Sequence, residues 1–552
     1  MATITFNRKI FENEIGKLDE KMQEKISMFG TPLETFNSEE IQIEVFPNRP
    51  DLLSYHGFKR SFLAFLGKKT GLRKYNLSSP KKDYKVVIES SVKDIRPHTA
   101  CAIISGLKLD DEKIKEIIEM QEKIHATLGR KRKKVAVGIY PLEKITLPII
   151  FKALEPEKIK FIPLEGNKEM SGIEILRKHP TGIEYSHLLK GKEKFPVFVD
   201  AKNNVLSMPP IINSELTGKV TIDTKDVFVE CSGFDFETLK KCLNIISTTL
   251  ADMGGKINQM SIVSKGKKEI TPNFGEEKMK ISLENTNKLL GLNLNEKHLK
   301  NLLEKMGYEY NKGTVKIPSW RTDILHEVDL IEDVAIAYGY DNFIPEIPEI
   351  STIGKESKRE IVKRKISEIL IGLNILEVSN YHLTNKNYQF KKMALSEKNL
   401  VELESSKTDY NILRKNLSHF LLKNFSDNVD VEYPQKIFEI GEIFELGKEK
   451  ISENESLAVA VAPGNFTELK QILEYLSRML NIQFTFTEAS NFPDYFIDGR
   501  VVEVIFEKDK IGYIGEIHPN ILKNWKIKMP VALFEISLEE VLDKLCLDSH
   551  PK

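Results

Sequence analysis

Four carboxylates between residues 323 and 333 have the types and spacing that could bind a metal ion. Asp329, Glu332 and Asp333 stand at positions i, i+3 and i+4 and would share one face of a helix, and Asp323 lies just before that helix. Carboxylate oxygens are the hard ligands that suit Mg²⁺. Acidic residues in a first helical turn also complement the helix dipole, and spacing alone favours this second interpretation.

One run of five consecutive basic residues could contact RNA: Arg130, Lys131, Arg132, Lys133 and Lys134. The alternative is a solvated charged segment, and composition does not separate the two. The chain has 81 basic and 81 acidic residues, so its formal net charge is zero and bulk charge gives no argument for a nucleic-acid partner. Any contact with RNA must therefore use a local patch such as this run.

Other chemistries find less support. No C-x-x-C pair occurs among the four cysteines, which argues against a zinc site or disulfide framework and fits a reducing cytoplasm. No Ser-His-Asp arrangement is evident, and His518, beside Pro519, is better explained as a structural histidine than as a general base. No run approaches the roughly 20 apolar residues of a membrane helix, and the N-terminus lacks the apolar core of a secretory signal.

At 552 residues the chain is too long for one core, and its patterns predict a multidomain α+β protein. Four segments are expected: 1–84, 85–267, 268–347 and 348–552. In the first, Asp51 or Ser54 caps a helix over residues 55–65. The second is a mixed α/β domain with helices over 112–128 and 235–253 and strands over 135–139, 146–151, 196–199, 205–207 and 227–233.

The third segment contains the elements that would position the four carboxylates. Asn295 is expected to cap a helix over 296–306, a hairpin turns near residue 312, and a second helix over 327–338 ends at Gly339. This order predicts a small winged-helix-like domain. The fourth segment opens with an amphipathic helix and continues as an antiparallel sheet with strands over 377–383, 435–444, 457–461, 500–506 and 531–536.

Four motifs occur in order along nearly the whole chain: NRPDLLS (48–54), LSMPPIINS (206–214), PSWRTD (318–323) followed by EDVA (332–335) and YGYD (338–341), and GYIGEIHP (512–519). Together they resemble phenylalanyl-tRNA synthetase beta chains, matching their N-terminal signature, editing domain, small central domain and synthetase-like domain. Little chain precedes Asn48 or follows Leu545, which leaves no room for the inserted oligonucleotide-binding barrel or the anticodon-binding domain of bacterial beta chains. The resemblance is therefore to the archaeal and eukaryotic type.

The resemblance implies a beta subunit that supports a catalytic alpha chain in an α2β2 heterotetramer, which attaches phenylalanine to tRNA(Phe) using ATP. The last segment resembles a class II synthetase fold, yet IFEIGEIF (437–444) has glutamate where active members place an arginine, and acids there would repel ATP. This domain is therefore expected to be an inactive copy that lacks catalytic arginines. The resemblance also implies a Mg²⁺ site, shared with the alpha chain, at the four carboxylates Asp323, Asp329, Glu332 and Asp333.

The resemblance further places an editing pocket in segment 85–267, for hydrolysis of tyrosine mis-attached to the phenylalanine tRNA. An apolar pocket rejects an added hydroxyl by only about 10²-fold, so a second site must bind that hydroxyl through a buried acceptor. Glu230 is the predicted acceptor, Ser232 shares its face by strand alternation, and Ser207 and Phe198 complete the wall. The family pattern has Asp and Thr where this chain has Glu230 and Ser232, and the longer acid would shrink the pocket.

Two other functions remain open. One is an assembly scaffold of the same enzyme that binds tRNA without chemistry of its own. The other is a free-standing tRNA deacylase, which the inactive synthetase-like domain disfavours because such a domain suggests a partner. Where editing occurs, the expected nucleophile is a water held by backbone amides and the tRNA.

Overall fold

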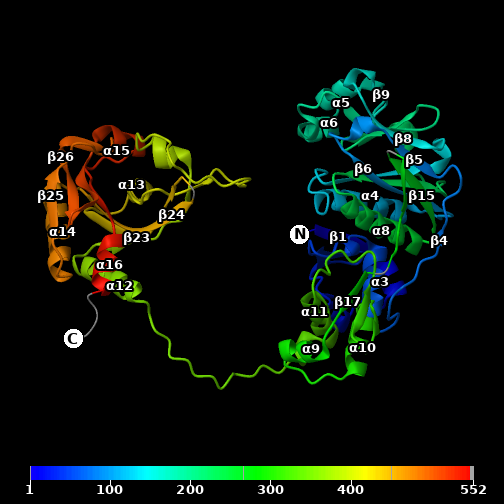
Figure 1. Ribbon diagram of the computed structural model, residues 1–552, viewed down its shortest axis with the longest axis horizontal. Coiled ribbons are helices and arrows are strands. Elements are labelled where there is room, and N and C mark those ends of the chain that lie inside the picture. The colour runs from blue at the N-terminus through cyan, green and yellow to red at the C-terminus, as the bar shows by residue number, and fades with distance from the viewer. Residues whose placement is uncertain (1, 265, 276, 449, 548–552) are drawn as a thin grey trace. The chain divides into compact units, whose positions relative to one another are not determined.

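The computed structural model describes residues 2–264, 266–275, 277–448 and 450–547 (Figure 1). The chain divides into two compact units, Met1–Ile347 and Pro348–Lys552. Both units combine helices with sheets, so the predicted α+β class is confirmed. Among the described residues, no helix has the length and apolar character needed to cross a bilayer.

The first unit begins with a three-stranded antiparallel sheet of order β1-β3-β2. Its elements are β1 (Ala2–Asn7), α1 (Arg8–Glu14), α2 (Glu20–Met28), β2 (Leu33–Phe36) and β3 (Glu40–Val45). The next helix, α3 (Tyr55–Phe65), has the predicted bounds. Ser54 caps it, because the Ser54 hydroxyl accepts a hydrogen bond from the Gly57 N–H at 3.1 Å. Asp51 is held instead by the guanidinium of Arg49.

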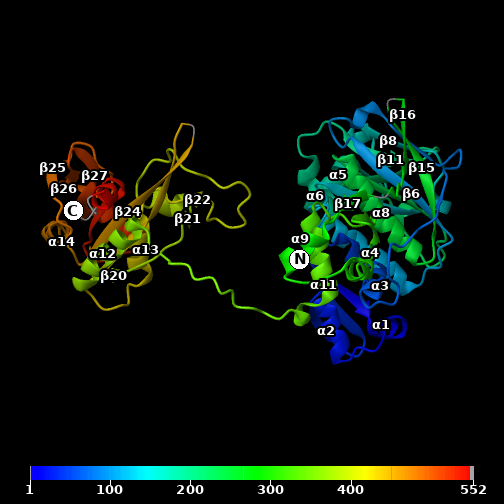
Figure 2. The ribbon, with the colours of Figure 1, turned by 60° about the horizontal axis from the view of Figure 1, so that its bottom comes forward.

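An eleven-stranded mixed sheet forms the middle of the first unit. Its main path runs β13-β12-β11-β8-β5-β15-β6-β14-β7, and β4 and β16 pair with β15. The helices α4 (Asp111–Ala126) and α8 (Phe236–Asp252) cover one face of it (Figures 1 and 2). The strands are β4 (Leu77–Ser78), β5 (Lys85–Ile88), β6 (His98–Ser105), β7 (Val135–Pro141), β8 (Ile149–Leu154), β11 (Phe195–Val199), β12 (Val205–Met208), β13 (Ile212–Asn213), β14 (Val227–Gly233), β15 (Lys256–Ser264) and β16 (Lys267–Thr271).

On the opposite face of this sheet, side chains from strands far apart in the sheet pack against one another. Tyr140 of β7 and Phe228 of β14 share a hydrophobic core with Phe151 of β8 and Phe198 of β11. Strands from both ends of the sheet therefore meet in one core, which requires the sheet to curl. Two short helices, α5 (Gly172–Lys178) and α6 (Pro180–Tyr185), lie beyond β11 and close a smaller core there.

The last part of the first unit follows the predicted helix, hairpin and helix. Its elements are β17 (Glu277–Lys280), α9 (Leu283–Leu290), α10 (Glu296–Lys305), β18 (Glu309–Asn311), β19 (Thr314–Ile317) and α11 (Glu327–Tyr338). The Asn295 side chain caps α10, and α11 ends at Gly339, which has a φ of 94°. The hairpin turns at Lys312 and Gly313, whose φ angles are 45° and 75°, as a tight primed turn requires.

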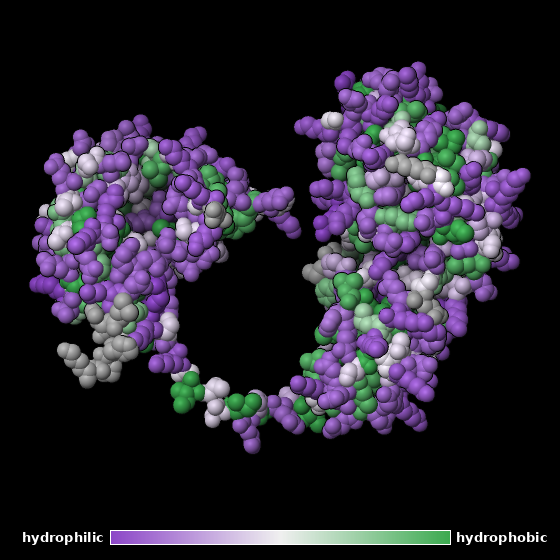
Figure 3. Space-filling view, in the orientation of Figure 1, coloured by the Kyte–Doolittle hydropathy of each residue, from purple (hydrophilic) through white to green (hydrophobic). Residues whose placement is uncertain are grey.

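Residues 343–357 join the two units without forming a helix or a strand. Four isoleucines recur at every third position of this segment and are 86%, 94%, 76% and 100% exposed: Ile344, Ile347, Ile350 and Ile353. Figure 3 shows hydrophobic side chains at the surface of the segment that joins the two units. A spacing of three is the period of an extended polyproline II helix, which would place these four side chains on one edge.

The second unit is built on a seven-stranded sheet of order β20-β23-β24-β28-β27-β26-β25, antiparallel except where β20 meets β23. One core lies under α12, α14 and α16 and another under α13 and α15 (Figure 1). The helices are α12 (Lys358–Gly372), α13 (Ser418–Asp427), α14 (Phe466–Met479), α15 (Pro519–Trp525) and α16 (Glu539–Leu547). The strands are β20 (Leu376–Glu377), β23 (Gln435–Leu446), β24 (Ile451–Ala462), β25 (Phe484–Glu488), β26 (Phe496–Phe506), β27 (Asp509–Ile517) and β28 (Ala532–Ser537).

The single strand predicted over 377–383 is wrong. The structure has two short strands there, β20 and β21 (Leu383–Thr384), and β21 pairs with β22 (Ile412–Leu413) in a separate sheet. The chain leaves the large sheet between them because the N–H and the side-chain amide of Asn380 donate to the carboxylate of Glu439. A buried side chain thus replaces the backbone ladder at this position.

Candidate functional site

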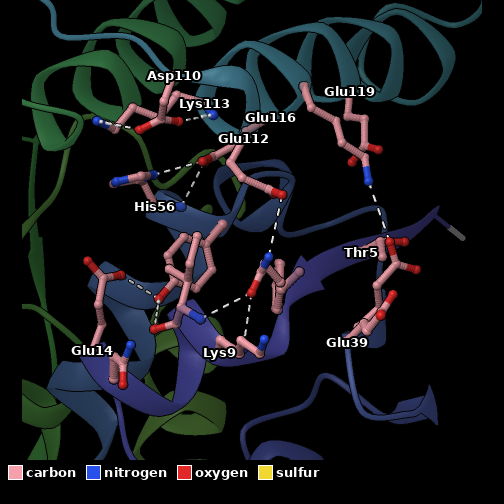
Figure 4. A pocket seen from close by; sticks show the side chains of 17 residues that line it. Thr5, Lys9, Glu14, Glu39, His56, Asp110, Glu112, Lys113, Glu116 and Glu119 are labelled. Atoms are coloured by element: carbon pink, nitrogen blue, oxygen red, sulfur yellow. Dashed lines mark hydrogen bonds and ion pairs between the residues drawn. The ribbon is translucent and has the colours of Figure 1, made fainter.

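A cavity of about 590 Å³ lies between the N-terminal sheet and α4 (Figure 4). Many of its side chains are charged and engaged with one another. Nδ1 of His56 lies 2.8 Å from Glu116 Oε2, and the Tyr55 hydroxyl donates to Glu14 at 2.5 Å. These contacts tie α1, α3 and α4 together. None of the predicted site residues lines this cavity, and we assign it a structural role.

A second cavity, of about 330 Å³, lies beside β7, the strand at one end of the large sheet. Its walls come from α4, from α6 and from the segment 209–213 that leads into β13. Glu230 of β14, one strand in from the edge, also lines it. The residue predicted to recognise a substrate hydroxyl therefore borders an open cavity.

Glu230 is 2% exposed and belongs to a hydrogen-bonded cluster centred on Tyr140. The Tyr140 hydroxyl lies 2.8 Å from Ser207 Oγ, 3.3 Å from Asn213 Oδ1 and 3.3 Å from Glu230 Oε1. The other carboxyl oxygen, Glu230 Oε2, is buried and has no hydrogen-bond partner among the described residues. Buried polar atoms are rarely unpaired, so this oxygen is the unsatisfied group of the one predicted pocket residue that lines the cavity.

Burial raises the pKa of Glu230 to about 8, although the buried guanidinium of Arg96 acts in the opposite direction. The carboxyl is therefore mostly protonated at neutral pH. Burial likewise lowers the pKa of Arg96 to about 10. A protonated carboxyl both donates and accepts hydrogen bonds, which matches the capacity of a phenol oxygen.

This pKa predicts a pH-dependent stability. Folded Glu230 keeps its proton up to about pH 8, whereas the unfolded group loses it near its ordinary pKa of 4.5. The free energy of unfolding should therefore fall as pH rises through that window, by at most about 1.4 kcal/mol per pH unit. Urea denaturation at about pH 5 and about pH 8 measures the fall. In Glu230→Gln, which cannot ionise, this part of the difference should vanish, and an unchanged difference would contradict the assignment.

The other three predicted pocket residues do not line the cavity. Ser207 reaches Glu230 only through Tyr140. Ser232 shares the face of Glu230, as predicted, but its hydroxyl accepts a hydrogen bond from Arg96 Nε at 3.1 Å. Phe198 is not a wall of the cavity, because its ring is turned into the core and stacks on Phe151 with centroids 4.2 Å apart.

The basic run is divided between structural and exposed side chains. Residues 130–132 have left-handed φ angles of 48°, 52° and 63°, which turn the chain after α4. Arg132 is fixed at the rim of the cavity, where it donates to the carbonyl of Ile211 at 2.7 Å and lies 4.4 Å from the ring centroid of Tyr185. The other four cations are exposed: Arg130, Lys131, Lys133 and Lys134.

The four carboxylates around α11 do not gather into one group. Arg321 donates two hydrogen bonds to Asp323, at 2.9 and 2.7 Å, and one to Asp333 at 2.8 Å. Asp329 accepts the N–H groups of residues 325 and 326 and so caps α11, while Glu332 is exposed. Across residues 2–264, 266–275, 277–448 and 450–547, no set of three or more acidic, histidine or cysteine side chains is arranged to hold a metal ion.

These donors therefore do not fit Mg²⁺ within this chain. The guanidinium of Arg321 already supplies the positive charge that Asp323 and Asp333 need, and it holds the pKa of Asp323 below its usual range against the effect of burial. Asp329 lies in the first turn of α11, where its negative charge complements the helix dipole, as the alternative interpretation expected. No reaction step in this chain is assigned to a metal.

The sheet of the second unit contains a buried arginine that the sequence analysis did not single out. Arg414 donates to Glu439 Oε1 at 2.6 Å and to the carbonyl of Glu442 at 2.7 Å, and only 2% of its side chain is exposed. Gly441 leaves the room, because a Cβ there would lie 2.3 Å from Arg414 Nη2. Arg414 neutralises Glu439, so of the two glutamates that this part of the strand carries, only the exposed Glu442 could repel ATP as predicted.

Sequence reasoning missed Tyr140, Asn213 and Arg96 in the cavity cluster. Tyr140 lies one residue beyond the strand predicted over 135–139, and Asn213 lies within the quoted motif LSMPPIINS, so both were near recognised patterns. Neither pattern predicts which strand lies opposite. The contact of Arg96 with Ser232, 136 positions away, leaves no local signal in the sequence.

Comparisons with known proteins agree over both units. A family model described as "tRNA synthetase B5 domain" matches residues 279–340, and one described as "Phenylalanyl tRNA synthetase beta chain CLM domain" matches residues 344–538. A crystal structure of an N-terminal fragment of the phenylalanyl-tRNA synthetase beta subunit from Pyrococcus horikoshii has a TM-score of 0.58 and 40% identity, covering 61% of this chain and 99% of that one.

Two relatives match this chain over most of its length at similar identity. The phenylalanine–tRNA ligase beta subunit of Thermococcus sibiricus is 42% identical over 501 residues, which is 89% of each chain. That of Archaeoglobus fulgidus is 36% identical over 551 residues, covering 98% of this chain and 99% of the relative. At this identity and coverage, the chain belongs to the phenylalanine–tRNA ligase beta subunit family.

Proposed function

We propose that this chain is the beta subunit of an α2β2 phenylalanine–tRNA ligase whose alpha chain uses ATP and phenylalanine. Family membership supports the role in phenylalanyl-tRNA synthesis, because the relatives carry that name. The state of Arg414 supports the division of labour, since this guanidinium is already bound to Glu439 within the sheet. The second unit then serves the alpha chain as a partner surface.

The cavity beside β7 is the proposed site for hydrolysis of tyrosine mis-attached to the phenylalanine tRNA. The observation that carries this proposal is the unpartnered Oε2 of Glu230 at the border of a 330 Å³ cavity. A tyrosine hydroxyl reaching this oxygen would gain a buried hydrogen bond that phenylalanine cannot make. The site would therefore prefer the wrong product to the right one.

The histidine at this cavity is not a catalytic base. His125 Nε2 accepts the N–H of Val137 at 2.8 Å, so its proton is on Nδ1, which lies 3.2 Å from Glu122 Oε1. Burial lowers the pKa of His125 and keeps the ring neutral. With both nitrogens engaged, the attacking group is a water. Its oxygen adds to the ester carbonyl and the ester C–O bond breaks. One water proton restores the hydroxyl of the tRNA, and the other passes to solvent as tyrosine leaves as its carboxylate.

The exposed cations next to the cavity rim are the proposed contact for the tRNA end. Arg132 anchors the left-handed turn, and its four exposed neighbours extend from the same turn into solvent: Arg130, Lys131, Lys133 and Lys134. Phosphate contacts of this kind position a nucleic acid without reading its sequence. They would hold the charged 3′ end over the cavity.

Glu230→Ala tests the hydrolytic function. In the complex reconstituted with the alpha chain, deacylation of Tyr-tRNA(Phe) should slow by roughly 10- to 100-fold, because the substrate hydroxyl loses its buried partner. Charging with phenylalanine should not change. Glu165→Ala is the matched control, since Glu165 is an exposed acid that lines the same cavity.

Three outcomes separate the functions. Slow deacylation in Glu230→Ala but not in Glu165→Ala supports editing at this cavity. An equal rate in Glu230→Ala and the unmutated complex would show that another group recognises the hydroxyl. If the unmutated complex hydrolyses no Tyr-tRNA, this chain is the assembly scaffold.

A further inference from the structure

We propose that Tyr140 determines the specificity of the cavity beside β7, because its own phenol occupies the hydrogen-bonding cluster that a tyrosyl ligand would use. This inference rests on the proposed function of that cavity. Tyr140 is fully buried, and its hydroxyl contacts three different strands through Ser207, Asn213 and Glu230. The phenol of Tyr140 is the same chemical group as the tyrosine side chain that the cavity is proposed to recognise.

The position of the Tyr140 ring depends on Gly138. These residues share one face of β7, and Gly138 stands directly opposite Glu230 of β14. A Cβ at position 138 would lie 2.1 Å from the Tyr140 hydroxyl oxygen, so the phenol lies in the space that a side chain there would fill. The absent side chain lets the ring lean along the strand and deliver its oxygen to Glu230.

The cluster has little capacity left for a second phenol. A phenol oxygen donates one hydrogen bond and accepts up to two, and the Tyr140 hydroxyl has three polar atoms within 3.3 Å. Ser207 Oγ and Glu230 Oε1 are therefore engaged. An incoming tyrosine can reach only Glu230 Oε2 unless the Tyr140 ring moves away.

The length of Glu230 fits this arrangement. The carboxyl group of a glutamate extends one methylene further from the strand than that of an aspartate, and here Oε1 ends 3.3 Å from the Tyr140 hydroxyl. Glu230 binds Tyr140 with Oε1 and leaves Oε2 without a partner. The position of the Tyr140 ring therefore decides whether a ligand can bind one or both of these oxygens. Selectivity for tyrosine is therefore limited by Tyr140, and removing its phenol should increase that selectivity.

The test measures binding of two stable analogues of a charged tRNA end, 3′-(L-tyrosyl)amino-3′-deoxyadenosine and its phenylalanyl counterpart, to the full chain by calorimetry. In Tyr140→Ala the preference for the tyrosyl probe should rise by about tenfold over the unmutated chain, the effect of one additional buried hydrogen bond. Tyr140→Leu keeps apolar bulk in the core and protects the experiment against loss of folding. It should raise the preference in the same direction by a smaller factor.

Phe228→Ala is the matched control. The Phe228 ring lies 5.7 Å from that of Tyr140 in the same core, so its removal leaves a comparable void but does not free the polar cluster. The preference should stay at the level of the unmutated chain. Failure of both Tyr140 variants to favour the tyrosyl probe, including failure to bind it, would overturn the inference, as would an equal rise in Phe228→Ala.

Different measurements would contradict the role of Tyr140 and the proposed hydrolysis. If Glu230→Ala slows deacylation while the Tyr140 variants bind like the unmutated chain, the hydrolytic function stands and the role of Tyr140 falls. If the Tyr140 variants prefer the tyrosyl probe but no protein hydrolyses Tyr-tRNA, the cavity is a tyrosine-binding site without hydrolysis.

Discussion

Purified without its partner, this chain should show no phenylalanine-dependent exchange of pyrophosphate into ATP. Adenylate formation requires cations placed at the phosphates of ATP. In the second unit, Arg414 is 2% exposed and donates to Glu439 and to the carbonyl oxygens of Asn380 and Glu442. Turning it toward a nucleotide would leave the buried Glu439 without its cation, at a cost of about 3–5 kcal/mol.

Adding the alpha chain should bring the exchange to a full enzymatic rate. The comparison is made at equal concentration of this chain with and without the co-expressed partner, using radiolabelled pyrophosphate. Robust exchange by this chain alone, lost on Arg414→Met, would assign an adenylation site to the second unit and refute the proposed division of labour.

The second large effect is expected for Arg321→Met. Arg321 is 3% exposed at its side chain and lies between Asp323 and Asp333, which are 9% and 6% exposed. The substitution leaves two buried carboxylates without their cation, so the free energy of unfolding of the first unit should fall by about 3–5 kcal/mol. Urea denaturation followed by tryptophan fluorescence measures it, since Trp320 belongs to the same core.

Two controls identify the cation at these carboxylates. Arg73→Met removes an arginine whose side chain is 46% exposed, and its partner Asp252 keeps Arg60 at 2.8 Å, so the loss should stay below about 1 kcal/mol. A chelator such as EDTA should not change the melting temperature of the chain. A large fall with EDTA and a small one with Arg321→Met would mean that a metal, not the arginine, balances these acids.

Local signals predicted much of the fold because they depend on residues close in sequence. The bounds of α3 and α11 follow from Ser54 before the first helix and Gly339 after the second, and Asn295 marks the start of α10. Strand 377–383 failed because its course is decided by Glu439, about 60 positions away. Strand propensity depends only on the residues of the segment itself, whereas the contact between Asn380 and Glu439 forms only when the sheet is assembled.

The candidate site was predictable only in part, because most of its contacts join residues that are far apart in the sequence. Strand alternation placed Glu230 and Ser232 on one face, and that is where they lie. Alternation does not tell which partner strand each side chain meets, so Arg96 beside Ser232 and Tyr140 beside Glu230 could not be foreseen. For the four predicted metal ligands, the spacing of the acids did not reveal that Arg321 binds two of them, Asp323 and Asp333.

The segment over residues 343–357 joins the two units covalently. A macromolecule that contacts one unit meets the other at an effective concentration on the order of millimolar, so two individually weak contacts multiply into a durable complex. The four exposed isoleucines give this segment an apolar surface of its own, so a macromolecule could also contact the segment itself. A macromolecule that binds both units would lose this gain if the segment were cut, although each unit would keep its own binding surface.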